Sequence, residues 1–165
     1  QTEEHENAKE PFLQSLPAAA GSSSDKHLAF YFFDPANLKE GIKKLKQTAE
    51  YLHAPCDALR AYVPLRFFME ELSREEISRY LSAEEEWSIS FIPYILNVSK
   101  GRLDQYISSH LQEIAEKTGD TGISIGNLSW LDEFLSRDVP VYADFGLNLY
   151  NRQARNVMEE QGVRF

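Results

Sequence analysis

The sequence predicts an α/β fold in which helices cover a mainly parallel sheet. Three observations support this prediction. Short apolar runs recur along the chain, each is followed by a segment whose apolar residues repeat every three or four positions, and no hairpin turn joins two consecutive runs. Parallel strands need long crossover connections, and helices usually provide them. The length of 165 residues, of which 42% are apolar, fits one domain.

The folded part is expected to begin near His27, after a flexible linker or tail over residues 1–26 that mixes charges with Gly and Ser. The first strand is "LAFYFF" (28–33), whose continuous apolar character is typical of a strand buried on both faces. Asp34 and Pro35 should start the first helix, because the carboxylate can accept hydrogen bonds from free amides and Pro suits the first turn. The apolar face of this helix is expected to contain Leu38, Ile42, Leu45, Ala49 and Leu52.

The same strand-and-helix pattern then recurs until a sixth strand begins. The later strands are expected at "LRAYVPL" (59–65), "SISFIPY" (88–94), "GISIG" (122–126), "VPVYA" (139–143) and "VRF" (163–165). Ser73 and Glu76 have the spacing of a capping box before the second helix, and Gly119 and Gly162 should end the third and the last helix. Aromatic residues inside runs such as "FYFF" are expected to pack in the core.

Two folds satisfy this alternation, a doubly wound sheet and part of a (β/α)8 barrel. A dinucleotide-binding doubly wound sheet would carry G-x-G-x-x-G after its first strand, and this motif is absent. A whole barrel needs about 250 residues, whereas the sequence holds five strand-and-helix units and the start of a sixth. We therefore expect residues 27–165 to form a partial (β/α)8, TIM-barrel-like domain of a longer protein.

Composition excludes several classes of partner. The net charge of −9 is concentrated in Gln1–Glu10, with −3, and Glu70–Glu86, with −5, which is typical of a solvated tail and a solvated helix. No basic stripe suggests nucleic-acid binding, and no apolar run approaches the ~20 residues of a membrane span. Cys56 is the only cysteine, so the chain has no internal disulfide and a cytoplasmic location is expected.

Polar residues follow several of the predicted strands at their carboxyl ends, where parallel α/β folds bind ligands. The candidate substrate-binding residues are Arg66, Asn97, Asn127, Asp144, Asn148 and Asn151. Several of them also have a structural alternative. Asn127 can bond to its own loop, Asn148 and Asn151 can cap the last helix, and Asp144 can bond to a neighbouring strand end.

Near its end the chain contains "GISIGNLSWLDEFL" and "PVYADFGLNLYNRQARNVMEEQGV". Together these two segments resemble motifs of the collagenase-like peptidases (peptidase family U32). Members of this family carry Gly-Asn-Leu after one strand and Asp-x-x-Leu-Asn-x-x-Asn after the next. Both segments match these motifs, and "SISFIPYILNVSKG" is similar to the family's strand that ends in Pro before a polar loop. The matching residues are Gly126, Asn127, Leu128, Asp144, Leu147, Asn148 and Asn151.

The resemblance implies a barrel-type fold and the activity of a peptidase whose catalytic class is not assigned. Some relatives are iron–sulfur proteins that hydroxylate RNA bases or quinones without oxygen, and their cluster cysteines follow the strand that begins here at Val163. Cys56 alone cannot ligate such a cluster, so we expect no cofactor in this chain and an iron–sulfur cluster only in a full-length parent. Because the sequence ends at Phe165, just after this strand begins, we expect it to be a fragment that stops before the cysteine-containing segment of the family.

No complete catalytic set is recognisable. The sequence lacks H-E-x-x-H, G-x-S-x-G and G-K-[ST], and the four histidines occupy unrelated positions. Two hypotheses remain: a fragment of a U32-type peptidase that is inactive by itself, or a non-catalytic domain for packing or partner binding. The expected partners are the remaining domains of the parent, or a second copy bound through the edge strands.

Overall fold

The structure, a computed structural model, describes residues 28–52, 58–81, 88–147, 149 and 151–165. The predictions for the tail at 1–26, for Cys56 and for Asn148 fall outside these residues. Six strands form a single sheet in the order β1-β2-β3-β4-β5-β6, and every neighbouring pair is parallel. The strands are β1 (Leu28–Tyr31), β2 (Ala58–Pro64), β3 (Ser88–Ile95), β4 (Ile123–Ile125), β5 (Val141–Ala143) and β6 (Val163–Arg164).

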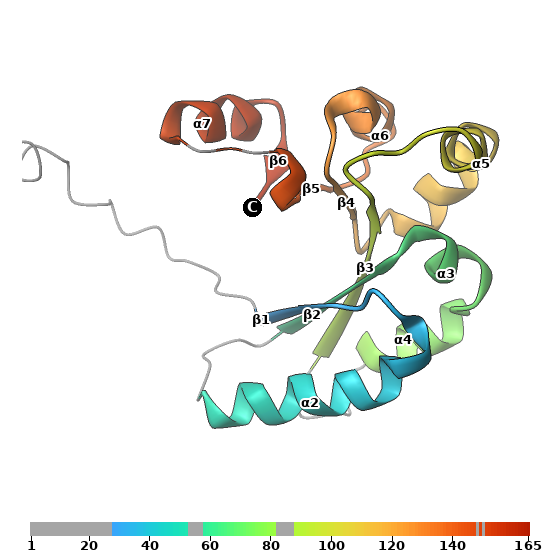
Figure 1. The fold of residues 1–165 in the computed structure, drawn as a ribbon, viewed down its shortest axis with the longest axis vertical. Helices are drawn as coiled ribbons and strands as arrows, with labels where there is room; N and C mark the ends of the chain where they lie inside the picture. The colour runs from blue at the N-terminus through green and yellow to red at the C-terminus, as the bar shows by residue number, and fades with distance from the viewer. Residues whose placement is uncertain (1–27, 53–57, 82–87, 148, 150) are drawn as a thin grey trace, which may run out of the picture.

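This sheet confirms the predicted parallel α/β fold. Its strand order follows the sequence from β1 to β6, whereas the order of a doubly wound sheet reverses in the middle, so the doubly wound alternative is excluded. Figure 1 shows the strands as an arc with the helices on its outer side and with β1 and β6 at its two ends.

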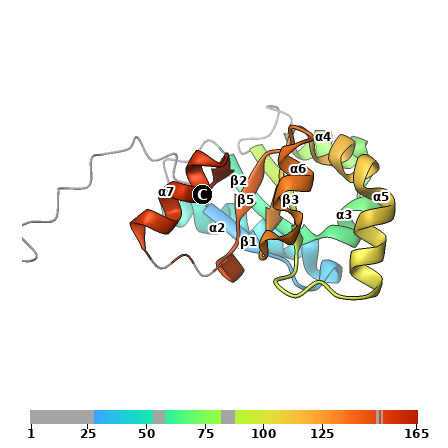
Figure 2. The same ribbon diagram turned by 90° about the horizontal axis from the view of Figure 1, so that it is seen from above.

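Helices connect the strands on that outer side, as Figure 2 shows from above. They are α2 (Leu38–Tyr51), α3 (Leu65–Glu70), α4 (Arg74–Leu81), α5 (Arg102–Thr118), α6 (Leu131–Leu135) and α7 (Arg152–Glu160), with short 3-10 turns η1 (Pro35–Asn37), η2 (Leu128–Trp130) and η3 (Phe145–Leu147). In the part of the chain that the structure describes, no helix has the length and apolar character needed to cross a membrane.

Local side chains define where these helices begin. The Asp34 carboxylate accepts a hydrogen bond from the Ala36 amide at 3.0 Å, as predicted. The capping box is also confirmed: the Glu76 amide donates to Ser73 Oγ at 3.1 Å, and the Ser73 amide donates to Glu76 Oε2 at 3.0 Å. These bonds supply partners for amides that have none within the helix.

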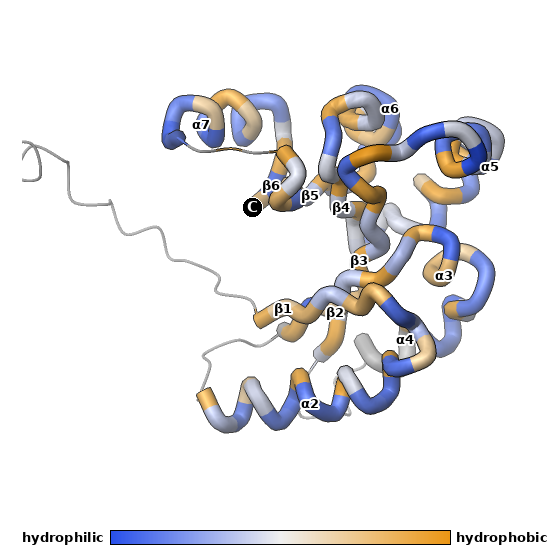
Figure 3. The backbone as a smooth tube through the Cα atoms, in the orientation of Figure 1, coloured by the Kyte–Doolittle hydropathy of each residue, from blue (hydrophilic) through white to orange (hydrophobic). Residues whose placement is uncertain are grey.

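The two faces of the sheet carry different residues. Along β2, Ala61 and Val63 belong to a core shared with α2, whereas Tyr62 between them belongs to a separate cluster on the inner face of the sheet. The inner-face cluster contains Tyr31, Tyr62, Ile92, Tyr94 and Tyr142. Figure 3 shows apolar residues along the strands and alternating polar and apolar residues along α2. The helices thus cover an apolar outer face, while tyrosines dominate the inner one.

The first strand differs from its prediction. It ends at Tyr31 rather than at Phe33, Ala29 is exposed, and Phe33 is 71% exposed. The prediction of a strand buried on both faces is therefore wrong. The physical reason is its position: β1 pairs only with β2 and lies at the edge of the described sheet. Leu52, predicted on the apolar face of the first helix, is 54% exposed because it follows the end of α2.

Candidate functional site

A pocket of about 260 Å³ opens at the carboxyl edge of the sheet. We call it the rim pocket; its lining includes Tyr31, Phe33, Tyr94, Asn97, Asp144 and Phe145. These residues come from the ends of β1, β3 and β5, which the parallel arrangement brings to one edge. A second pocket of about 430 Å³ shares Phe33 and Tyr94 with it and extends toward Arg66.

Asp144 is held firmly in the rim pocket. It follows β5 directly, is 7% exposed, and its amide donates to the Ile125 carbonyl at the end of β4 at 3.0 Å. Its Oδ1 atom accepts hydrogen bonds from the Tyr31 hydroxyl at 3.0 Å and from the Phe145 amide at 2.7 Å. Because Tyr31 lies on β1, the bond between their side chains links the first strand to the end of the fifth across the inner face.

Aromatic rings surround this carboxylate. Tyr31 stacks on Tyr62, with ring centroids 4.5 Å apart and planes at 7°, and its centroid lies 5.7 Å from that of Tyr94. Burial and the charge of Asp144 raise the pKa of Tyr31 and Tyr94 above the ordinary value. Burial also raises the pKa of Tyr62, although the neighbouring Arg60 opposes the change. The inner face therefore favours neutral tyrosines beside a negative charge.

Two glycines make room for Asn97 in the same pocket. A Cβ atom on Gly126, after β4, or on Gly146, after Asp144, would collide with the Asn97 side-chain amide. Each glycine thus allows a close approach that a larger residue would permit only if the Asn97 side chain moved. Asn97 is partly buried and belongs to the lining of the pocket.

Asn127 fastens two loops at this edge. Its Oδ1 atom accepts from the Ser129 amide at 2.9 Å and caps η2, while its Nδ2 donates to the Asn97 carbonyl at 3.2 Å. Trp130 Nε1 donates to Ser99 Oγ at 3.1 Å and adds a second link between the same loops. Asn127 therefore does not line the rim pocket but holds in place the loop that carries Asn97, which does.

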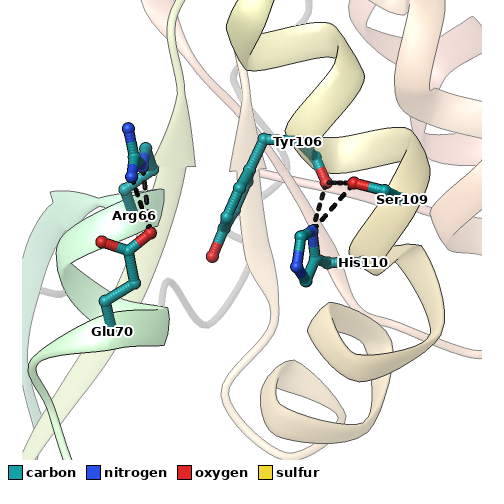
Figure 4. A network of polar contacts seen from close by, with 5 residues as sticks. All are labelled: Arg66, Glu70, Tyr106, Ser109 and His110. Carbon is teal, nitrogen blue, oxygen red and sulfur yellow. Dashed lines mark hydrogen bonds and ion pairs between the residues drawn. The ribbon is translucent and has the colours of Figure 1, made fainter.

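Asn151 and Arg66 do not line the rim pocket. Asn151 caps α7 by accepting from the Ala154 amide at 2.8 Å, which is the structural alternative foreseen for it. The Arg66 guanidinium pairs with Glu70 at 2.9 Å and lies 5.3 Å from the centre of the Tyr106 ring. Figure 4 shows this network, in which the Tyr106 carbonyl and Ser109 Oγ contact His110 Nδ1. Arg66 lines the second pocket rather than the rim pocket.

Of the residues predicted from sequence, the structure brings Asp144 and Asn97 together in one pocket, with Asn127 behind them. Tyr31, Phe33 and Phe145 were not predicted as site residues. The expectation that the aromatic residues of "FYFF" all pack in the core is wrong for Phe33, because β1 ends before it. The sequence contained a sign of their role, since Phe33 is the last residue of one predicted strand and Phe145 lies two residues after the end of another.

The described residues offer no set of ligands for an iron–sulfur cluster. Within the described ranges, no three His, Cys, Asp or Glu side chains come together as metal ligands.

Fold and pocket define an α/β protein with a sequentially ordered parallel sheet and a polar, aromatic pocket at the carboxyl ends of its strands. No family model, no curated protein and no solved structure matches the chain.

The raised pKa values of Tyr31, Tyr62 and Tyr94 on the inner face predict that the protein loses stability at alkaline pH. Their pKa values in the folded protein lie above the ordinary value of 10.0, so the unfolded chain loses these protons first as the pH rises. The contribution of each raised tyrosine pKa to the free energy of unfolding is fully present below about pH 10. It is lost as the pH rises further, at up to about 1.4 kcal/mol per pH unit for each tyrosine. Urea unfolding at pH 9, 10 and 11 should show a shallower loss for Tyr31→Phe than for the unchanged protein.

The control for this experiment is Tyr51→Phe, at a position 83% exposed on α2. It should leave the pH dependence of the free energy of unfolding unchanged. Equal pH dependence in the Tyr31→Phe variant and in the unchanged protein would contradict the prediction.

Proposed function

We propose that this chain is the substrate-binding part of a (β/α)8-barrel protein of the collagenase-like peptidase type. The observation that carries the proposal is the position of Asp144. This residue begins the Asp-x-x-Leu-Asn-x-x-Asn segment that resembles the family, and it lines a pocket at the carboxyl edge of the sheet. Barrel enzymes bind their substrates at that edge. The sequential strand order and the helices on the outer side support a partial barrel.

The pocket is suited to binding rather than to bond cleavage. It provides a carboxylate, a side-chain amide and aromatic walls, which can orient a ligand. Among the described residues, its lining contains no serine, threonine, cysteine, lysine or histidine that could act as a nucleophile or pair with Asp144 as its base. The groups that would cleave a peptide, or hydroxylate a base or a quinone, are proposed to come from other parts of a longer parent protein in the cytoplasm.

Binding of a collagen-like peptide to the labelled chain tests this proposal. A short (Gly-Pro-Pro)n peptide should shift the NMR signals of the Asn97 side-chain amide and the Phe145 backbone amide. The Asp144→Asn variant should weaken this response, whereas Asp132→Asn, an exposed position on α6, should not. Signal changes confined to the outer helices, or none at all, would refute substrate binding at the rim.

The chain by itself is expected not to hydrolyse gelatin. A carboxylate without a nucleophile or a positioned partner contributes little to the rate of peptide hydrolysis. A gelatin zymogram of the purified chain should show no cleared band. A band that disappears in the Asp144→Ala variant would show that this reasoning is wrong.

A non-catalytic, partner-binding role is the second candidate, and the exposed apolar residues at the carboxyl edge favour it. Phe33 and Phe145 are each 71% exposed, Val98 is 67% exposed and Leu96 is 53% exposed. Contiguous apolar surface of this kind is typical of interaction sites. The remaining domains of the parent would then cover this edge.

The two ends of the sheet predict association between copies of the chain. β1 pairs only with β2, and β6 only with β5, so in the described sheet each leaves one edge without a strand partner. Such edges can pair with another chain unless something covers them. Light scattering at high concentration should detect species larger than a monomer. A uniform monomer whose β1 and β6 amides exchange as slowly as those of β3 would contradict this prediction.

A further inference from the structure

Four aromatic rings form an open box in the rim pocket. The Phe33 centroid lies 6.2 Å from that of Tyr31, with planes at 22°, and 6.2 Å from that of Tyr94, with planes at 66°. The Phe145 ring stands edge-on to Tyr31 at 6.5 Å and 72°. Phe33 and Phe145 are both 71% exposed, so much of their ring surface is not covered by the protein. The rings come from the ends of β1 and β3 and from η3, so the fold assembles the box from distant segments.

The charge inside this box is negative. Asp144 is the only acidic side chain among the described residues that line the pocket, and no lysine, arginine or histidine is among them. The negative charge of Asp144 contributes to the raised pKa values of Tyr31 and Tyr94 in the box and of Tyr62 beside it. Arg66 belongs to the second pocket and pairs with Glu70, and Arg60 on the inner face lies 4.7 Å from the centre of the Tyr142 ring.

Such surroundings discriminate between classes of ligand. The faces of aromatic rings attract cations, and a carboxylate in the same pocket strengthens this attraction. A neutral planar ring would gain from the aromatic faces but not from the carboxylate, and an anion would be repelled by it. A volume of about 260 Å³ accommodates a small head group rather than a folded partner.

We propose that the rim pocket, with its box of Tyr31, Phe33, Tyr94 and Phe145 beside the Asp144 carboxylate, binds the ammonium group of an organic cation. This inference rests on the proposed function, because it names the class of ligand for the same pocket. A substrate of the parent protein would then present an alkylated amine or a lysine-type side chain to the rim.

Choline and its neutral isostere 3,3-dimethylbutan-1-ol provide a direct test, because they share shape and differ in charge. NMR titration of the labelled chain should show choline shifting the Asn97 side-chain amide and the Phe145 amide. Choline is expected to bind about tenfold more tightly than the neutral alcohol. Equal affinity for the two probes, or no response to choline at the rim, would overturn the proposal.

Matched variants separate charge from shape. Asp144→Asn keeps an oxygen that can accept from the Tyr31 hydroxyl and the Phe145 amide, so it should fold normally and weaken choline binding about tenfold while leaving binding of the alcohol unchanged. Phe145→Leu should also weaken choline binding, whereas Tyr51→Leu, an exposed aromatic residue on α2, should not. Unchanged choline affinity in Asp144→Asn would refute the role of the carboxylate.

The outcomes also separate this inference from the proposed function. If choline shifts no signals at the rim but the collagen-like peptide still shifts those of Asn97 and Phe145, the pocket binds substrate without selecting a cation. In that case only the proposal of cation binding is wrong. If both probes fail while circular dichroism shows a folded chain, the rim pocket is not a ligand site and both proposals are wrong.

Discussion

Asp144→Ala is expected to lower the free energy of unfolding by about 3 kcal/mol, because it removes a partner shared by two partly buried donors. The carboxylate is 7% exposed and accepts from the Tyr31 hydroxyl and from the Phe145 amide. Without it, both donors lose this bond, and the link between β1 and the end of β5 disappears. Urea unfolding monitored by circular dichroism measures the change.

Two further variants show whether hydrogen bonding is the cause. Asp144→Asn retains an acceptor oxygen and should lose much less stability than Asp144→Ala. Asp132→Ala, at an exposed position on α6, should change the free energy of unfolding by less than about 0.5 kcal/mol. An Asp144→Ala protein as stable as the unchanged chain would show that the carboxylate does not hold the two strands together.

Lys117→Met is expected to destabilise the protein by about 2 kcal/mol. The Lys117 ammonium group donates to the carbonyls of Phe68 at 2.7 Å, Met69 at 3.0 Å and Leu72 at 2.6 Å. These carbonyls lie at and just beyond the carboxyl end of α3, where helical carbonyls lack partners and a positive charge is favourable. Methionine preserves most of the apolar stem of lysine but cannot donate any of the three bonds.

Thermal and urea unfolding of Lys117→Met should both report the loss, since the ammonium group joins α5 to α3. Lys43→Met, an exposed position on α2, is the matched control and should have little effect. Equal losses in the two variants would mean that the three carbonyl contacts contribute nothing specific.

Sequence alone predicted the order and type of most elements, because local interactions decide them, but it did not predict the helix α3 (Leu65–Glu70). The cap at Asp34 involves an amide two residues away, and the box of Ser73 and Glu76 spans three residues. The prediction of parallel strands rested on crossover helices, which follow each strand directly in the chain. Strand boundaries were less accurate: "LAFYFF" ends as a strand at Tyr31, because no local pattern reveals that β1 lies at the edge of the described sheet.

The candidate site was predicted only in part. Asp144 and Asn97 could be selected because each follows a strand at the end where ligands bind. Asn127 and Asn151 could not be separated from them, since an asparagine after a strand can line a pocket or cap the next helix. The structure shows that both accept hydrogen bonds from amides within three residues.

The sequence by itself thus determined a chain of strands and helices, its helix caps and the edge at which polar residues gather. Only the tertiary structure decided which of these residues meet. Tyr31 and Asp144 are separated by 113 positions, and the hydroxyl of one reaches the carboxylate of the other across the inner face. Asn97 likewise fits against Gly126 and Gly146 from two other loops. Such contacts depend on the twist and curvature of the whole sheet, which the spacing of apolar residues along one segment does not encode.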